Sequence, residues 1–170
     1  GVISLILLSS RPLDMVWGLE IQESLARQAA RNVLLNGCSE RMAVVRGDLR
    51  HLPFAGSCAH VVVCNPPYRK ARSGRINPDP QRAIARHELT ARLGEIVRSA
   101  SFLLKSRGRF ATIYPAERLV DLFGQLRRVN LEPKRLRMVH PSPRCGAKLV
   151  LVEAAAGAKP GLRVEDPVFT

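Results

Sequence analysis

A run of four residues, Asn65-Pro66-Pro67-Tyr68, combines side chains that could position a reacting group. Asn carries an amide oxygen that accepts hydrogen bonds, each Pro has a fixed φ and no N–H, and Tyr offers a flat ring. A turn that only ends a strand needs at most one Pro. We therefore predict that Asn65, Pro66, Pro67 and Tyr68 form a catalytic loop.

The chemistry that suits such a loop is methylation of an amino group attached to an aromatic ring or an amide. The lone pair of that nitrogen is delocalised, so the group must be oriented before it reacts. The Asn65 oxygen and a backbone carbonyl of the Pro-fixed turn can accept both N–H hydrogens and direct the lone pair at a methyl sulfonium. Tyr68 can stack on a flipped base.

Two carboxylates, Glu20 and Asp48, follow strand-like patterns. At the carboxyl end of a parallel strand, Glu20 could accept hydrogen bonds from the two hydroxyls of a ribose. Its simpler interpretation is a solvated acid or a charge at a helix N-terminus, and that of Asp48 is a turn residue. Both acids lie at strand ends on the same edge of the predicted sheet, so together they favour an adenosine-type cofactor.

The elements that must hold these residues alternate between short apolar runs and longer helical patterns. This alternation predicts an α/β fold with a doubly wound, mostly parallel sheet. The apolar run Val61-Val62-Val63-Cys64 is typical of a central strand covered on both faces. The predicted strands are 15–19, 42–46, 61–64 and 110–114, and the predicted helices are 22–35, 84–104 and 116–129, after an apolar helical stretch that ends near Ser9.

The carboxyl-terminal part has a different pattern. Two β-rich runs, 135–140 and 148–154, flank a turn rich in Pro and Gly, which predicts an antiparallel hairpin that closes one edge of the sheet. We expect one domain over residues 1–156, followed by a tail over residues 157–170.

The formal net charge of +13 predicts a polyanionic partner such as RNA or DNA. Only five of the 27 basic residues are Lys, and GC-rich codon usage alone could produce that Arg excess. The four Cys form no C-x-x-C pair and have no His at zinc-site spacing, which predicts free thiols and no metal. No run suits a membrane span or a signal peptide, so we expect a cytoplasmic protein.

The motif Asn65-Pro66-Pro67-Tyr68 is similar to that of amino-group methyltransferases that act on adenine N6, guanine N2 or the glutamine of release factors. Two further runs, Ser73-Gly74-Arg75-Ile76-Asn77-Pro78 and Ala85-Arg86-His87-Glu88, are more specific. They resemble the bacterial family of tRNA adenine-37 N6-methyltransferases that act on a valine tRNA. The resemblance continues through residues 131–140 and 149–153, so it covers nearly the whole chain.

This resemblance implies a Rossmann-like class I methyltransferase that uses S-adenosylmethionine and acts on tRNA. The cofactor ligands that it implies or that we expect are Gly1, Glu20, Ile21, Asp48, Leu49 and Asn65. A solvated loop is the simpler interpretation of the basic segment after Tyr68, but phosphate binding is the one that we adopt. The RNA ligands that we expect there are Arg69, Lys70, Arg72, Arg75, Arg82 and Arg86.

The chain departs from the family pattern at its beginning. The family's Asp-x-Gly-x-Gly-x-Gly cofactor loop is represented at most by Gly1, so we expect the first strand of the sheet to be missing. That strand would lie inside the family sheet, and its loss would leave a seam for another segment or chain to fill. A catalytically dead RNA-binding fragment is therefore one alternative, and methylation of guanine N2, DNA adenine or release-factor glutamine is another.

Overall fold

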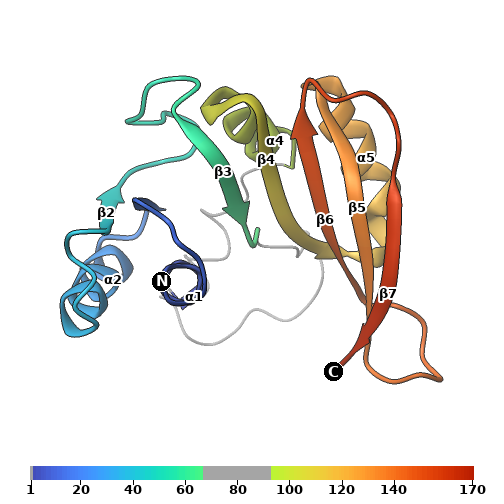
Figure 1. Cartoon of the computed structure of the whole chain (residues 1–170), viewed down its shortest axis with the longest axis horizontal. Coiled ribbons are helices and arrows are strands. Elements are labelled where there is room, and N and C mark those ends of the chain that lie inside the picture. Colours follow the sequence, from blue (N-terminus) through green and yellow to red (C-terminus); the bar gives the residue numbers. More distant parts are fainter. Residues whose placement is uncertain (1, 67–92) are drawn as a thin grey trace, which may run out of the picture. The chain divides into compact units, whose positions relative to one another are not determined.

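Residues 2–66 and 93–170 are described by a computed structural model and fall into two units (Figure 1). Unit 1 spans Gly1–Pro53, and unit 2 spans Phe54–Thr170. No helix in the described ranges is both long and apolar enough to cross a lipid bilayer.

Unit 1 is a short α/β unit with a two-stranded parallel sheet. Its elements are α1 (Val2–Ser10), β1 (Val16–Glu20), α2 (Glu23–Leu35) and β2 (Met42–Arg46). β1 and β2 pair in parallel from Val16 beside Met42 to Glu20 beside Arg46. Leu8, Val33 and Met42 form the buried core, so α1 and α2 both contribute to the packing of this small sheet.

Helix α2 ends where its apolar periodicity stops. The N–H of Gly37 donates to the carbonyl of Leu34 and the N–H of Cys38 donates to that of Val33, both over 3.0 Å. Gly37 has a φ of 61°, a left-handed conformation that glycine adopts without steric cost. This Schellman arrangement satisfies the last helical carbonyls and turns the chain toward β2.

Unit 2 is built on a mixed five-stranded sheet in the order β3-β4-β6-β5-β7. β3 pairs in parallel with β4 and β5 in parallel with β7, whereas β6 runs antiparallel to its neighbours β4 and β5. Its elements are β3 (Ala59–Cys64), α4 (Leu93–Leu103), β4 (Leu104–Pro115), the 3₁₀ turn η1 (Ala116–Arg118), α5 (Leu119–Arg128), β5 (Leu131–His140), β6 (Leu149–Ala156) and β7 (Arg163–Phe169).

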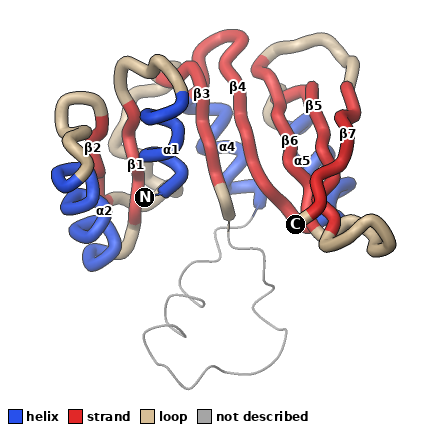
Figure 2. The backbone as a smooth tube through the Cα atoms, turned by 60° about the horizontal axis from the view of Figure 1, so that its bottom comes forward, coloured by secondary structure: helices blue, strands red, loops and turns tan. Residues whose placement is uncertain are grey.

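Helices α4 and α5 cover one face of this sheet (Figures 1 and 2). Val97 of α4 and Leu122 and Leu126 of α5 are fully buried, as are Phe110 of β4 and Val150 of β6. Apolar residues at helical spacing therefore meet alternate residues of the strands, which is the packing that a two-layer α/β unit requires.

The opposite face of the sheet in unit 2 carries charged and apolar side chains. Glu153 of β6 forms ion pairs with Arg109 of β4 and Arg135 of β5, and Glu165 of β7 pairs with Arg135 at 2.7 Å. Arg137 also pairs with Glu165, at 3.0 Å. These pairs link four neighbouring strands, but most of the arginine side chains remain in contact with solvent, so each pair contributes little stability.

The prediction that β3 is covered on both faces is not met within unit 2. β3 is the first strand in the order of its sheet, and Val61 and Val63 are 52% and 41% exposed. Successive side chains of a strand point to opposite faces, so these two lie on the face away from α4 while Val62 lies on the other. The continuous apolar run identified a strand but did not identify its neighbours.

The predicted hairpin is confirmed, because β5 and β6 pair antiparallel from Leu131 beside Ala156 to Val139 beside Leu149. The edge of the sheet differs from the prediction. Residues 163–169 lie within the expected tail and form β7, which pairs with β5 beyond the hairpin. The register between β5 and β7 shifts after Arg137 pairs with Glu165 and before Val139 pairs with Val168. Two residues of β7, Asp166 and Pro167, therefore stand opposite one residue of β5. Pro lacks an N–H, so it is tolerated on such an irregular edge strand.

Candidate active site

The carboxyl ends of β1 and β2 bring the two predicted acids of unit 1 to one edge. Glu20 is the last residue of β1, and Asp48 lies two residues after β2 ends at Arg46. The N–H of Gly47 donates to the carbonyl of Glu20 over 3.0 Å, which extends the pairing of the two strands. The edge predicted from the strand patterns therefore exists, with both carboxylates half-buried on it.

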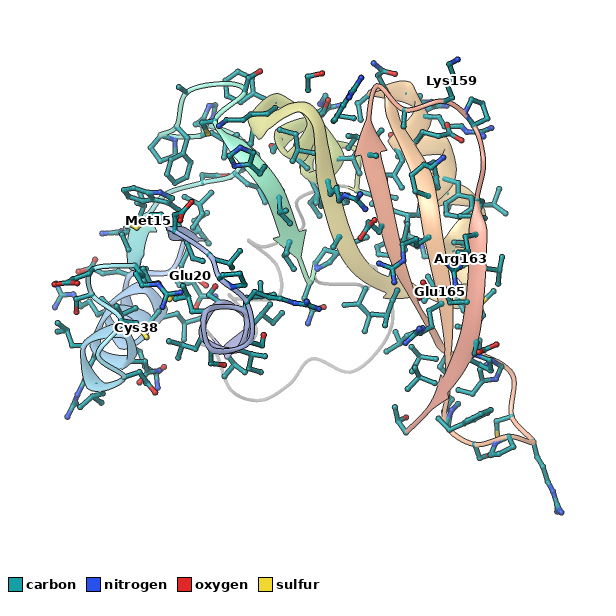
Figure 3. All side chains as sticks on the ribbon, in the orientation of Figure 1. Met15, Glu20, Cys38, Lys159, Arg163 and Glu165 are labelled. Atoms are coloured by element: carbon teal, nitrogen blue, oxygen red, sulfur yellow. The ribbon has the colours of Figure 1, made fainter. Side chains whose placement is uncertain are left out.

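The backbone anchors the carboxylate of Glu20, the residue that Figure 3 labels in unit 1. The N–H of Gln22, which precedes helix α2, donates to Oε1 over 3.0 Å. This bond fixes one carboxylate oxygen and leaves the acceptor capacity of Oε2 for hydroxyl donors. This acceptor therefore suits the hydroxyls of a ribose. Glu20 also places a negative charge just before the N-terminus of α2, as the simpler interpretation proposed.

Asp48 is held by Arg50. The Arg50 N–H donates to Oδ1 over 2.9 Å, and the guanidinium Nε and Nη2 donate to Oδ2 over 2.9 and 2.5 Å. The side-chain hydrogen bond with Arg50, followed by the backbone one, lowers the pKa of Asp48 below its ordinary value. The carboxylate is therefore ionised at neutral pH and held in one orientation, as an acceptor for an amino group requires.

The residues that follow the two acids, Ile21 and Leu49, are half-buried. Gly47 directly follows β2 in a confined position, because an added Cβ would come within 3.0 Å of Leu19 Cδ1 and 3.3 Å of Pro53 Cγ. A side chain at position 47 would have to displace these neighbours. The glycine therefore allows the chain to turn closely after β2 and present Asp48 at the edge.

In unit 2, the predicted catalytic loop begins directly after β3. Asn65 is exposed and Pro66 is buried. Burial raises the pKa of the preceding Cys64 thiol to about 11, so that the thiol is protonated at neutral pH. Cys64 therefore acts as a small apolar residue at the end of β3 rather than as a nucleophile.

Two side chains near this end of the sheet were not identified from the sequence. Tyr114 is 3% exposed and lies near the end of β4, two residues beyond Thr112, the register partner of Cys64. The Arg118 guanidinium lies 5.3 Å from the centre of the Tyr114 ring. Burial raises the pKa of Tyr114, so its hydroxyl is a hydrogen-bond donor at neutral pH. The sequence feature that could have identified Tyr114 is an aromatic residue next to Pro115 at the end of an apolar strand.

The remaining predicted site residues lie outside the described ranges. They are Gly1 of the cofactor set, Pro67 and Tyr68 of the catalytic loop, and Arg69, Lys70, Arg72, Arg75, Arg82 and Arg86 of the RNA set. Among the described residues, no group of three or more His, Cys, Asp or Glu side chains is arranged to hold a metal ion. All four Cys are described and carry free thiols.

Several curated bacterial enzymes are similar to the chain in sequence. A Porphyromonas gingivalis enzyme named tRNA1(Val) (adenine(37)-N6)-methyltransferase is 34% identical over 157 residues, which are 90% of this chain and 61% of that enzyme. A Parabacteroides distasonis enzyme of the same name is 29% identical, over 92% of this chain and 65% of that enzyme. The chain thus spans a little over three fifths of these relatives. No protein-family model matches the chain.

Solved structures share the fold at low sequence identity. A protein of Agrobacterium tumefaciens described as a predicted O-methyltransferase superposes with a TM-score of 0.70 and 19% identity, over 91% of this chain and 68% of its own. A Listeria monocytogenes protein assigned to the class I S-adenosylmethionine-dependent methyltransferases superposes with a TM-score of 0.65 and 13% identity, over 99% of this chain and 54% of its own. The fold is that of the class I methyltransferases.

Glu20, Asp48 and Asn65 each lie at or just beyond the carboxyl end of a strand of this methyltransferase fold, where open α/β sheets bind ligands. The first two lie together in unit 1, and Asn65 belongs to unit 2.

Proposed function

We propose that the intact protein transfers a methyl group from S-adenosylmethionine to the exocyclic N6 of an adenine in tRNA. The observation that carries this proposal is that Asn65 and Pro66 stand directly after β3 of a class I methyltransferase fold. Similarity to enzymes named for adenine-37 of tRNA1(Val) indicates that nucleotide as the acceptor. We also propose a cytoplasmic location, which the four free thiols favour.

The chain's own residues fit the adenosine half of the cofactor. Oε2 of Glu20 would accept from the ribose hydroxyls, and Asp48 would accept from an amino group, with Ile21 and Leu49 beside the adenine ring. Arg50 keeps Asp48 ionised for this role. When bound, the cofactor supplies an electrophilic methyl group.

The acceptor is oriented by the turn after β3. The amide oxygen of Asn65 and the backbone carbonyl of Pro66 would each accept one N–H hydrogen of the adenine amino group. This arrangement would direct the nitrogen lone pair out of the ring plane, toward the methyl carbon, and hold the reacting groups in place. Tyr68 would stack on the flipped adenine.

A transfer assay tests this proposal. The intact protein, methyl-labelled S-adenosylmethionine and unmodified tRNA1(Val) should give labelled N6-methyladenosine after nuclease digestion. A tRNA with guanosine in place of adenosine 37 is the matched control and should stay unlabelled. Ribosomal RNA, duplex DNA and release factor are parallel acceptors. Label in one of these but not in tRNA would refute the proposed substrate, and no label in any acceptor would refute the proposed activity.

A further inference from the structure

The positive charge of the chain is concentrated in unit 2. The described residues of unit 2, 54–66 and 93–170, contain fourteen Lys and Arg against seven Asp and Glu. Unit 1 contains six basic and five acidic residues. Codon usage raises the Arg content of a whole chain and does not by itself separate the charge in this way. The location of these basic residues within unit 2 therefore carries information.

Five basic residues gather where β4 and β5 begin and β6 ends, on the edge of the sheet opposite Asn65. Lys159 follows β6 at this edge (Figure 3), and the Nζ of Lys134 donates to its backbone carbonyl over 3.1 Å. Arg128 ends α5 just before β5. We call this set the basic edge: Lys105, Arg107, Arg128, Lys134 and Lys159.

Two members of the basic edge lie in a bulge of β4. Leu104 pairs with Ala59 and Arg109 pairs with Val61, so four residues from Lys105 to Gly108 stand opposite His60 alone. Gly108 is required there, because an added Cβ would come within 2.8 Å of the carbonyl oxygen of Lys105. The bulge therefore projects Lys105 and Arg107 from the edge.

Arg107 occupies this bulge in a strained conformation. Its φ is 61°, in the left-handed region, where glycine fits best and a long side chain is disfavoured. Its side chain is exposed, so packing against neighbours does not explain an Arg at this position. Backbone strain of this kind clusters at functional positions, which makes Arg107 a candidate for a functional side chain.

The carboxylates near the basic edge are already engaged. Glu132 pairs with Arg127 at 2.7 Å, and Glu153 pairs with Arg109. Within the described ranges, none of the five residues of the basic edge forms an ion pair with a carboxylate, and the Nζ of Lys105 lies 3.2 Å from Nε2 of His60. Their charges are therefore available to an external anion. Phe102, 52% exposed on the last turn of α4 just before Lys105, adds an aromatic surface.

We propose that the basic edge binds the phosphate backbone of the RNA substrate at a distance from the reacting adenine. This inference rests on the proposed function for the identity of the RNA, but not for the binding itself. Five residue steps of β4 separate Arg107 from Thr112, the register partner of Cys64, or at most roughly 16 Å at about 3.3 Å per residue. An RNA stem is long enough to contact protein well beyond the flipped base. Lysine and arginine bind phosphate in this way without reading sequence.

The double variant Arg107→Gln/Arg128→Gln in the intact protein tests the proposal. The affinity for tRNA is measured against NaCl concentration, with Arg11→Gln/Arg31→Gln of unit 1 as a control of equal charge change. Loss of two phosphate contacts should reduce the slope of log K against log salt by roughly 1 to 2 and weaken binding about tenfold or more at moderate salt. The control should bind like the wild type. An unchanged slope and affinity in the basic-edge variant would overturn the proposal.

The single variant Arg107→Gly separates binding from folding. Glycine relieves the left-handed strain, so this variant should have an equal or higher Tm but weaker tRNA binding. Full tRNA affinity in a stable Arg107→Gly protein would count against a role for this residue. If the variants instead lose binding to anionic lipid vesicles and keep tRNA binding, the basic edge is a membrane surface and the proposal fails.

Failure of the basic-edge inference can be told apart from failure of the proposed function. If the wild type transfers methyl groups to tRNA while the basic-edge variants bind tRNA normally, only the inference about the basic edge is wrong. If the wild type binds tRNA through this edge but methylates no RNA, only the proposed activity is wrong.

Discussion

The N–H of Gly47 donates to the backbone carbonyl of Glu20 over 3.0 Å, which ties the chain after β2 to the end of β1. This single bond sets the separation of the two turns that carry the predicted cofactor acids. The bond lies one residue beyond the last register pair of the two strands, which is Glu20 beside Arg46. The acids are therefore positioned by the strands themselves rather than by a separate flexible loop.

The Glu20→Gln variant should bind S-adenosylmethionine about tenfold more weakly, because a charged acceptor of two hydroxyls becomes a neutral amide. Calorimetry on the intact protein measures this change. Glu23→Gln is the matched control, since Glu23 lies three residues away and pairs with Arg46 at 2.7 Å and Arg27 at 2.5 Å. Equal losses in both variants would exclude a specific role for Glu20.

The Asn65→Ala variant should lower kcat by about 10²–10³, because one acceptor that orients the reacting amino group is lost. Cofactor affinity should change much less, which calorimetry can check. Asn65→Asp retains an acceptor oxygen and should keep more activity than Asn65→Ala at neutral pH. Full kcat in the Ala variant would contradict the orienting role.

The Arg50→Gln variant should raise the pKa of Asp48 toward its ordinary 3.8, because the guanidinium hydrogen bonds lower it in the folded protein. A depressed carboxylate pKa contributes stability above the ordinary pKa, and this contribution disappears as the pH falls through the folded-state pKa. Wild type and variant should thus converge in stability in strong acid. Carboxyl NMR titration measures the pKa, and an unchanged value would refute the assignment.

Two glycines of unit 2 should respond in opposite directions to alanine. Gly108→Ala should destabilise the protein by about 1–3 kcal/mol, because the new Cβ would lie 2.8 Å from the Lys105 carbonyl oxygen. Gly124→Ala should be neutral or stabilising by up to about 1 kcal/mol, because Gly124 lies inside α5 with no atom within 4 Å of an added Cβ. Urea unfolding of both variants checks the signs.

Thiol alkylation at neutral pH should modify Cys58 and Cys145 well before Cys64. The first two are exposed, whereas burial raises the pKa of Cys64 to about 11 and leaves little of the reactive thiolate. Mass spectrometry of peptides after timed iodoacetamide treatment gives the order. Early modification of Cys64 would contradict the burial of its thiol at the end of β3.

The sequence alone predicted the chemistry of the candidate site and determined the local structure around it. Asn65 and Pro66 were predicted from their residue types, and Glu20 and Asp48 were predicted because apolar runs mark where strands end. The end of α2 at Gly37 was also predicted from the sequence. Each of these features depends on neighbouring residues, and short-range sterics and hydrogen bonding determine them.

Only the tertiary structure decided which distant segments meet. The run 163–169 has mixed charges and a Pro, so its pattern did not predict β7, which forms because β5 offers a free edge and Arg135 and Arg137 can pair with Glu165. The exposed face of Val61 and the basic edge likewise depend on strand order. Strand partners are chosen by contacts between residues far apart in the chain, which no local pattern encodes.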